Sequence, residues 1–413
     1  MLTLLFFVPI FIGNRVRKAG AFVLYNPLLY LVVFSYFYLL VPSLLPSESP
    51  VSEFLGLGRE SFDRVGLFSC WFLVVFLSAY SLSRDFSVEL KENFVTPRLT
   101  LRLATFFLIV SVGVSVFVLY SHGFSLYVLS SNRSDSYEYY RTNILVPYAY
   151  QLVFQLAVVS SCVLALSNRN IKYFLMLLPF LLLDFLQGGR AFTFMASVSF
   201  CLVAVLVHPR GGKRILGLVS SFVLVLFVSA FIRRSLPSSG AMEIEASLID
   251  MFGEFYFTRL TAEYIYSYSL GAGDFFDFML LVISKLFPQF IIGAFSSIGD
   301  IARYDVELNE TVDIGFGLAG SILAESFYYG GEWFAWLAPV VIAAIYFLLY
   351  RIKIVGTLPG FVFFLLLVGS SFSIFRSAFF LSFTALIYTF FVYFSFVVFT
   401  SWRVRLLRFG HLG

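Results

Sequence analysis

The sequence predicts an all-α, polytopic integral membrane protein, and three observations predict it. Of the 413 residues, 60% are hydrophobic and only 13% are charged, whereas soluble domains carry roughly 25% charged residues. The apolar residues fall in repeated runs of about 17–24 residues, which suits helices that cross a hydrocarbon core of ~30 Å. The Lys and Arg residues gather in alternate loops between these runs. Disordered, collagen-like, nucleic-acid-binding and disulfide-scaffold proteins are excluded.

Eleven apolar segments are expected to form transmembrane helices. The first is short for a full span, so it is expected to lie partly in the membrane interface. The last two meet at a tight turn around Arg376 and should form a helical hairpin. The segments cover residues 2–12, 22–42, 62–83, 101–121, 147–167, 171–187, 191–208, 214–233, 332–350, 359–375 and 377–400.

The charged residues predict how these helices are oriented. Seventeen of the 28 Lys and Arg residues lie in alternate loops that contain only three acidic residues, Asp85, Glu89 and Glu92. The other side, counting Asp184 and Glu325 there, contains 11 basic and 21 acidic residues, so the two sides carry net charges of +14 and −10. Because cytoplasmic loops are enriched in Lys and Arg, we expect the amino terminus outside and the carboxyl terminus in the cytoplasm.

The longest predicted loop, residues 234–331, is external and separates spans 1–8 (1–233) from spans 9–11 and a cytoplasmic tail (332–413). A loop of this length is expected to be functional. The apolar stretch 275–295 within it is interrupted by Asp277, Lys285 and Pro288, and we interpret it as an interfacial or re-entrant helix pair. In an alternative interpretation it is a true span, which requires a second span at 314–330.

One candidate site surrounds Asp184, because an ionisable residue within a span is costly and indicates function. Asp184 and Gln187 are three residues apart and share a helical face. The glycines at 188 and 189 should end the helix and leave Arg190 at the external rim, where its planar guanidinium can bind two phosphate oxygens. The structural alternative is an ion pair between Asp184 and Arg190 that holds the turn.

Three further arginines, Arg376, Arg233 and Arg234, are expected at the same external depth. Each alone is explained by an aliphatic stem in the apolar layer and a charged head at its surface. Together with Arg190, on the side where basic residues are scarce, they indicate an anionic ligand such as a lipid-linked pyrophosphate.

The glycine-rich run 315–331 contains a candidate general base. Ser321 and Glu325 are four residues apart and share a helical face. Glu325 lies among apolar residues, an environment in which a carboxyl group can act as a base near neutral pH. The alternative is a packing seam of small residues with one satisfied carboxylate.

Aromatic residues are dense outside the predicted spans. Tyr256 and Tyr264 flank Arg259 in the external region, and Arg303 follows later. Tyr rings stack on sugar faces, so these four residues are candidate substrate contacts, and sugar contact is also considered for Tyr266 and Tyr268 of the same loop, whereas most other tyrosines are interpreted as an interfacial belt. His122, at the external end of the fourth span, can act as acid or base, although a lone His in a turn is usually structural.

No cofactor site is evident in the sequence. The three Cys and three His residues do not cluster with the spacing of metal ligands. No phosphate-binding loop, Asp-rich metal motif or Ser nucleophile elbow occurs. We therefore expect no metal, no cofactor and no nucleic-acid partner.

These features resemble those of bacterial Wzy-type O-antigen polymerases, which join oligosaccharide repeat units. About eleven spans with one large external loop before the last spans form the layout of that family. The turn Gly188-Gly189-Arg190 is similar to its mid-chain Gly/Ser-Arg turn, and residues 320–331 resemble its Ser…Glu…Tyr…Gly segment beyond the large loop.

The resemblance implies a metal-independent glycosyltransferase of the GT-C class in the bacterial inner membrane. It would transfer an undecaprenyl-pyrophosphate-linked glycan onto a lipid-linked repeat unit at the periplasmic face. The four arginines would stabilise the departing pyrophosphate, and Glu325, Asp184 or His122 would assist the attacking hydroxyl. Membrane lipid and a polysaccharide chain-length regulator are the other expected partners.

Two alternatives remain. An O-antigen ligase has the same layout, but ligases are thought to use a His in the large loop, and this loop contains none. A transporter or flippase for lipid-linked sugars predicts pseudo-symmetric halves, whereas the polar residues here concentrate in one external loop.

Overall fold

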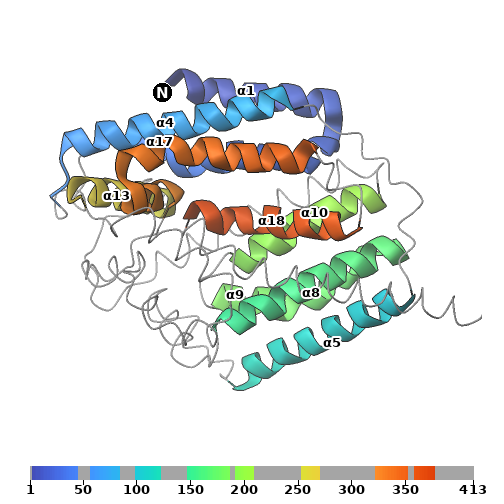
Figure 1. Ribbon diagram of the computed structural model, residues 1–413. Coiled ribbons are helices and arrows are strands. Elements are labelled where there is room, and N and C mark those ends of the chain that lie inside the picture. The colour runs from blue at the N-terminus through green and yellow to red at the C-terminus, as the bar shows by residue number, and fades with distance from the viewer. Residues whose placement is uncertain are drawn as a thin grey trace, which may run out of the picture. The chain divides into compact units, whose positions relative to one another are not determined.

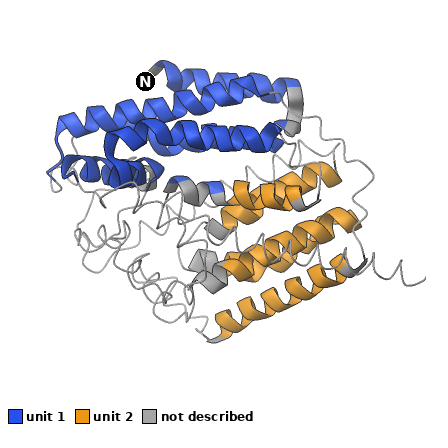
Figure 2. Cartoon of the chain, viewed as in Figure 1, with its two compact units in different colours: residues 1–87, 243–353, 371–384 blue, residues 88–242, 354–370, 385–413 orange. Residues whose placement is uncertain are grey.

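The computed structural model describes residues 2–44, 56–83, 98–121, 147–186, 191–208, 253–269, 321–351 and 358–376. Regular structure in these residues is helical throughout, and they contain no strand. The chain divides into two compact units, shown in Figure 2. Unit 1 comprises residues 1–87, 243–353 and 371–384, and unit 2 comprises residues 88–242, 354–370 and 385–413.

Unit 1 is built around α4, which packs against α2, α13 and α17. Figure 1 shows α4 and α17 side by side. The longer helices are α1 (Leu2–Ala19), α2 (Pro27–Ser35), α4 (Arg59–Leu82), α13 (Gly253–Ser267) and α17 (Ile322–Arg351). The 3₁₀ helix η1 (Gly20–Tyr25), the π-helical η2 (Tyr36–Leu40) and the 3₁₀ helix η3 (Pro42–Leu44) complete the unit.

The start of α2 is hydrogen-bonded to the end of α4. Asn26 caps α2 by accepting a hydrogen bond from the Leu28 N–H at 3.1 Å, and Pro27 takes the first helical position. The Asn26 amide donates to the Ser83 hydroxyl at 2.7 Å. Arg15 of α1 donates to the carbonyl of Ser83 at 2.9 Å and to that of Ser81 at 3.0 Å. A basic side chain therefore supplies donors to carbonyls at the carboxyl end of α4.

α17 begins ten residues before the predicted span at 332–350. The Ser321 hydroxyl accepts from the Ala324 N–H at 3.0 Å and caps the first turn. At Gly331 the backbone adopts φ 61° and ψ −156°, a conformation open essentially only to glycine. The sequence suggested that these glycines separate a loop from a span. They instead form a kink between a short arm (322–330) and a long arm (332–351).

Unit 2 is centred on α8, which packs against α5, η4 and α10. Its chain reverses after α8, where the Asn170 side chain accepts from the Lys172 N–H at 3.0 Å. This reversal agrees with the short basic loop expected at Arg169 and Lys172. The unit contains α5 (Arg98–Ser121), α8 (Pro147–Asn168), η4 (Ile171–Leu177), α9 (Leu178–Leu186), α10 (Ala191–Val207) and the first part of α18 (Leu358–Arg376).

Four segments of the described chain are long and apolar enough to cross a membrane, namely Pro27–Leu44, Arg59–Leu82, Thr100–Tyr120 and Ile322–Arg351. Shorter apolar helices occupy Leu152–Asn168, Ile171–Leu182, Thr193–Val207 and Gly360–Gly369. Large apolar side chains point outward on two of the long helices: Phe117 of α5 is 68% exposed and Leu348 of α17 is 62% exposed. Outward apolar faces on helices of this length suit a lipid environment.

Some helices begin or end close to the predicted spans, whereas α1 continues to Ala19, beyond the predicted end at 12. α4 and α5 begin within three residues of the predicted starts at 62 and 101. α9 ends at Leu186 and α10 begins at Ala191, on either side of the predicted reversal. The predicted spans at 214–233 and 377–400, and the stretch 275–295, lie outside the described residues.

Candidate functional site

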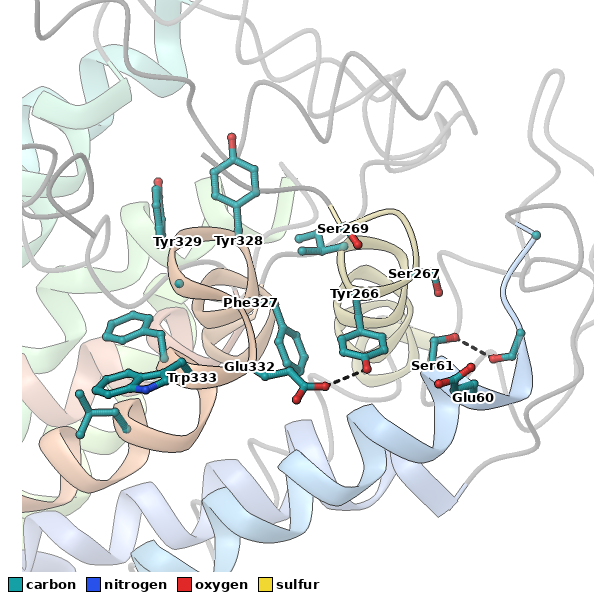
Figure 3. Close-up of a pocket in the computed structure, with 17 residues that line it drawn as sticks. Glu60, Ser61, Tyr266, Ser267, Ser269, Phe327, Tyr328, Tyr329, Glu332 and Trp333 are labelled. Carbon is teal, nitrogen blue, oxygen red and sulfur yellow. Dashed lines mark hydrogen bonds between the residues drawn. The ribbon is translucent and has the colours of Figure 1, made fainter. Parts of the chain in front are cut away.

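A pocket of about 1090 Å³ lies in unit 1, where the start of α4, the end of α13 and the kink of α17 meet (Figure 3). This volume is slightly above the usual range for small-molecule sites, about 300–1,000 Å³. The residues that line it are Gly56, Gly58, Glu60, Ser61, Ile265, Tyr266, Ser267, Ser269, Phe327, Tyr328, Tyr329, Gly330, Gly331, Glu332, Trp333, Phe334 and Leu337.

A hydrogen bond between α13 and α17 crosses one side of the pocket. The Tyr266 hydroxyl donates to Glu332 Oε1 at 2.8 Å, and Figure 3 shows the two side chains pointing toward one another. Burial raises the pKa of Tyr266, and the hydrogen bond to Glu332 and the charge of that residue raise it further. The phenol therefore stays protonated and acts as a donor near neutral pH.

Aromatic packing fixes α17 against α4 beside the pocket. The ring of Phe327 lies 5.4 Å from that of Tyr266 and 5.1 Å from that of Phe68. Farther along, the Trp71 indole N–H donates to the Trp336 carbonyl at 3.0 Å, and their rings lie 5.2 Å apart. Aromatic pairs of this kind contribute more stability than the burial of their surface area alone provides. These contacts therefore hold the pocket-lining part of α17 in place against α4.

The chemistry of the lining favours a neutral, hydroxyl-rich ligand. Two carboxylates, Glu60 and Glu332, face the same space as Ser and Tyr hydroxyls and the rings of Phe327, Trp333 and Phe334. No Lys or Arg is among the lining residues of the described chain. Aromatic faces bind the apolar side of a sugar ring and carboxylates accept from its hydroxyls, whereas an anion would be repelled.

Arg259, expected to contact substrate, is turned toward groups of the protein itself. The residue is 3% exposed, and its Nε lies 2.8 Å from Glu263 Oε1. Its Nη1 donates to the Pro42 carbonyl at 2.6 Å, and its guanidinium lies 4.7 Å from the centroid of the Phe62 ring. Arg259 thus joins α13 to the start of η3 and to the start of α4, next to the pocket.

Glu263 is the partner of Arg259 and is itself 1% exposed. Burial raises the pKa of Glu263 to about 7, although the charge of Arg259 and its hydrogen bond lower it. The carboxyl group is therefore close to half-ionised at neutral pH.

Glu325 lies in the short arm of α17, 2% exposed, and is not among the pocket-lining residues. Its N–H donates to the Ser321 carbonyl at 2.9 Å, so the two residues do share a helical turn as the sequence indicates. The first turn of a helix is favourable for a negative charge.

The other predicted site residues fall in several places. The ring of Tyr264 lies 4.8 Å from that of Tyr268, tilted by 50°, and neither residue lines the pocket. The backbone of Tyr256 lies in α13, that of Asp184 in α9 and that of Arg376 at the end of α18. His122, Arg190, Arg233, Arg234 and Arg303 lie outside the described residues.

Several pocket residues were not predicted from the sequence, chiefly Glu332, Trp333 and Glu60, whereas Tyr266 is one of the large-loop tyrosines that the sequence offered as sugar contacts, and it does line the pocket. Glu332 and Trp333 stand at the first positions of a predicted span and were interpreted only as its edge. A carboxylate and a Trp directly after two glycines, at the mouth of an apolar run, are the signal that could have singled them out.

Among the described residues, no group of three or more His, Cys, Asp or Glu side chains is placed to hold a metal ion. Comparisons of the chain with protein-family models, with curated proteins and with solved structures found no significant match. The function is therefore argued from the pocket and the sequence.

Proposed function

We propose that this protein is a polysaccharide polymerase of the bacterial inner membrane. It transfers an undecaprenyl-pyrophosphate-linked glycan onto a lipid-linked repeat unit at the periplasmic face, and its architecture is GT-C-like with eleven transmembrane helices. The observation that carries the proposal is the pocket at the kink of α17, whose aromatic rings and carboxylates suit a saccharide.

The position of the pocket supports a lipid-linked saccharide over a soluble one. Two of the helices that form it, α4 and α17, are long and apolar enough to cross a membrane. Trp333, 74% exposed, and Leu337, 37% exposed, continue from the pocket onto the outward face of α17. A ligand with a sugar head and an isoprenoid tail matches this change from polar to apolar surface.

The pocket is suited to the sugar part of the substrate and not to its pyrophosphate, because its two charged lining residues are acidic. The pyrophosphate requires a separate cationic site. Arg190, Arg376, Arg233 and Arg234 remain the residues proposed for it, because a planar guanidinium binds two phosphate oxygens and keeps its charge.

Deletion of the gene in its own bacterium tests the proposal through the electrophoretic ladder of the surface polysaccharide. For a polymerase, the ladder collapses to single repeat units attached to the normal acceptor, and a plasmid copy restores the long chains. A ligase defect would instead leave long chains on the lipid carrier, and a flippase defect would leave repeat units facing the cytoplasm. An unchanged ladder would reject the polymerase.

A further inference from the structure

We propose that the pocket of unit 1 is the acceptor subsite of this polymerase and that Glu332 receives the proton of the attacking sugar hydroxyl. This inference rests on the proposed function. It assigns the base to a residue seven positions beyond Glu325, in a different arm of the same helix.

The kink of α17 brings Glu332 to the pocket. Without the turn at Gly331, with φ 61° and ψ −156°, the long arm would continue the direction of the short arm. With it, Glu332 faces Tyr266 of α13 across the lining (Figure 3). Glu325, before the kink, is enclosed within the protein.

The hydrogen bond from Tyr266 leaves one oxygen of Glu332 for the substrate. Oε1 accepts from the Tyr266 hydroxyl, while Oε2 has no hydrogen-bond partner within the described part of the chain. A general base must lie within hydrogen-bond reach of the proton it removes and must be held in orientation. Tyr266 is thus a positioning residue. The other charged groups that act electrostatically on its phenol are Glu60 and Arg64 of α4.

The transfer balances without a cofactor. The acceptor hydroxyl oxygen forms a new bond to the anomeric carbon of the donor sugar, and the bond from that carbon to the pyrophosphate oxygen breaks. The electron pair leaves with undecaprenyl pyrophosphate, and the hydroxyl proton passes to Oε2 of Glu332. The products are the elongated lipid-linked glycan and the free lipid carrier.

The test uses membranes that contain the full-length protein and lipid-linked repeat units extracted from the deletion strain. In Glu332→Gln the side-chain shape and an acceptor for Tyr266 remain, but the base is lost. We expect kcat to fall at least about 100-fold with KM within about threefold of the wild type. Glu332→Asp keeps a carboxylate and should recover part of the rate, and Tyr266→Phe should lower kcat more than it changes KM.

Asp63→Asn is the matched control, because Asp63 is an exposed carboxylate of α4 that does not line the pocket. Its kcat should equal that of the wild type. A wild-type rate in Glu332→Gln, or loss of rate in Glu325→Gln alone, would overturn the assignment while leaving the polymerase intact. Absence of polymer with the wild-type protein would instead reject the proposed function itself.

Discussion

At the scale of single residues, two donors attach α13 to the end of the first long apolar segment. Pro42 has no N–H to complete an α-helical hydrogen bond to the Tyr38 carbonyl, and the Thr258 hydroxyl donates to that carbonyl at 3.1 Å. The next residue, Arg259, donates to the Pro42 carbonyl. Adjacent side chains of α13 thus satisfy carbonyls that the proline and the helix end leave available.

The pair formed by Arg259 and Glu263 predicts a dependence of stability on pH. Because folding raises the pKa of Glu263 from its ordinary value of 4.5 to about 7, the folded protein binds this proton more tightly than the unfolded chain. The contribution to stability is complete below pH 4.5 and is lost as the pH rises through about 7. A shift of this size corresponds to about 3 kcal/mol, or several degrees in Tm.

Thermal unfolding in detergent between pH 5 and pH 8 measures this contribution. Glu263→Gln is neutral at every pH, so it should lack this part of the pH slope and should be at least as stable as the wild type at pH 8. If the variant is instead less stable at pH 8, the attraction between Arg259 and Glu263 outweighs the cost of burying their charges.

The sequence was sufficient to single out reactive residue types but not to group them. Glu325 was a candidate because of its charge in apolar surroundings and Arg259 because tyrosines flank it, and both are buried. The pocket joins residues near 60, 266 and 332, and no local pattern connects positions so far apart. Pairing of Tyr266 with Glu332 depends on tertiary packing, which one sequence does not contain.

At the scale of elements, the long helices were predictable because a bilayer demands apolar runs of fixed length. The positions of α4 and α5 could be predicted from the length of their apolar runs. The start of α17 did not follow from it, because its short arm lies outside the predicted span and is stabilised by the Ser321 cap and by burial among unit 1 helices. Gly330-Gly331 indicates a break in direction, yet a break can end a helix or bend it.

The kink of α17 predicts opposite effects for two Gly→Ala substitutions. A Cβ at Gly331 meets no atom within 4 Å, and neither does a Cβ at Gly113 in α5. An added methyl group therefore has room at both positions. The two sites differ in backbone conformation, because Gly331 has a φ of +61° and Gly113 is helical. Gly331→Ala should destabilise the protein by about 1–3 kcal/mol, whereas Gly113→Ala should be neutral or stabilising by up to about 1 kcal/mol.

The two variants are compared by thermal unfolding in the same detergent. A lower Tm for Gly331→Ala than for Gly113→Ala is the expected order. Equal midpoints would mean that the kink relaxes at no cost. Loss of polymer in Gly331→Ala at a temperature where it is still folded would add that the bend, and with it the direction of Glu332, matters for function.

At the scale of the whole molecule, the contacts within unit 1 define which end of α4 lies next to the pocket. Arg15 and Ser83 meet at one end of α4, while Phe62 and Arg259 meet at the other. The long arm of α17 leaves the pocket and covers 20 residues to the basic Arg351, a rise of about 30 Å. The basic ends of α1 and α17 therefore lie away from the pocket.

This arrangement predicts the behaviour of reporter fusions along the chain. Alkaline phosphatase, active only outside the cytoplasm, should be active when inserted after Gly56 and inactive after Ser83 or Arg351, and green fluorescent protein should give the opposite result. Activity after Ser83 would reverse the proposed orientation and would place the pocket on the cytoplasmic side.

An insertion after Asp300 separates the two interpretations of residues 275–295. Ser269 and Phe327 both line the pocket, so the chain between them leaves from and returns to one side. Within the alternative span at 314–330, the described helix begins after the Ser321 cap and covers 322–330, about 14 Å of the ~30 Å of hydrocarbon that a span crosses. We therefore expect phosphatase activity after Asp300, as for an interfacial or re-entrant helix pair, and an inactive fusion there would establish 275–295 as a true span.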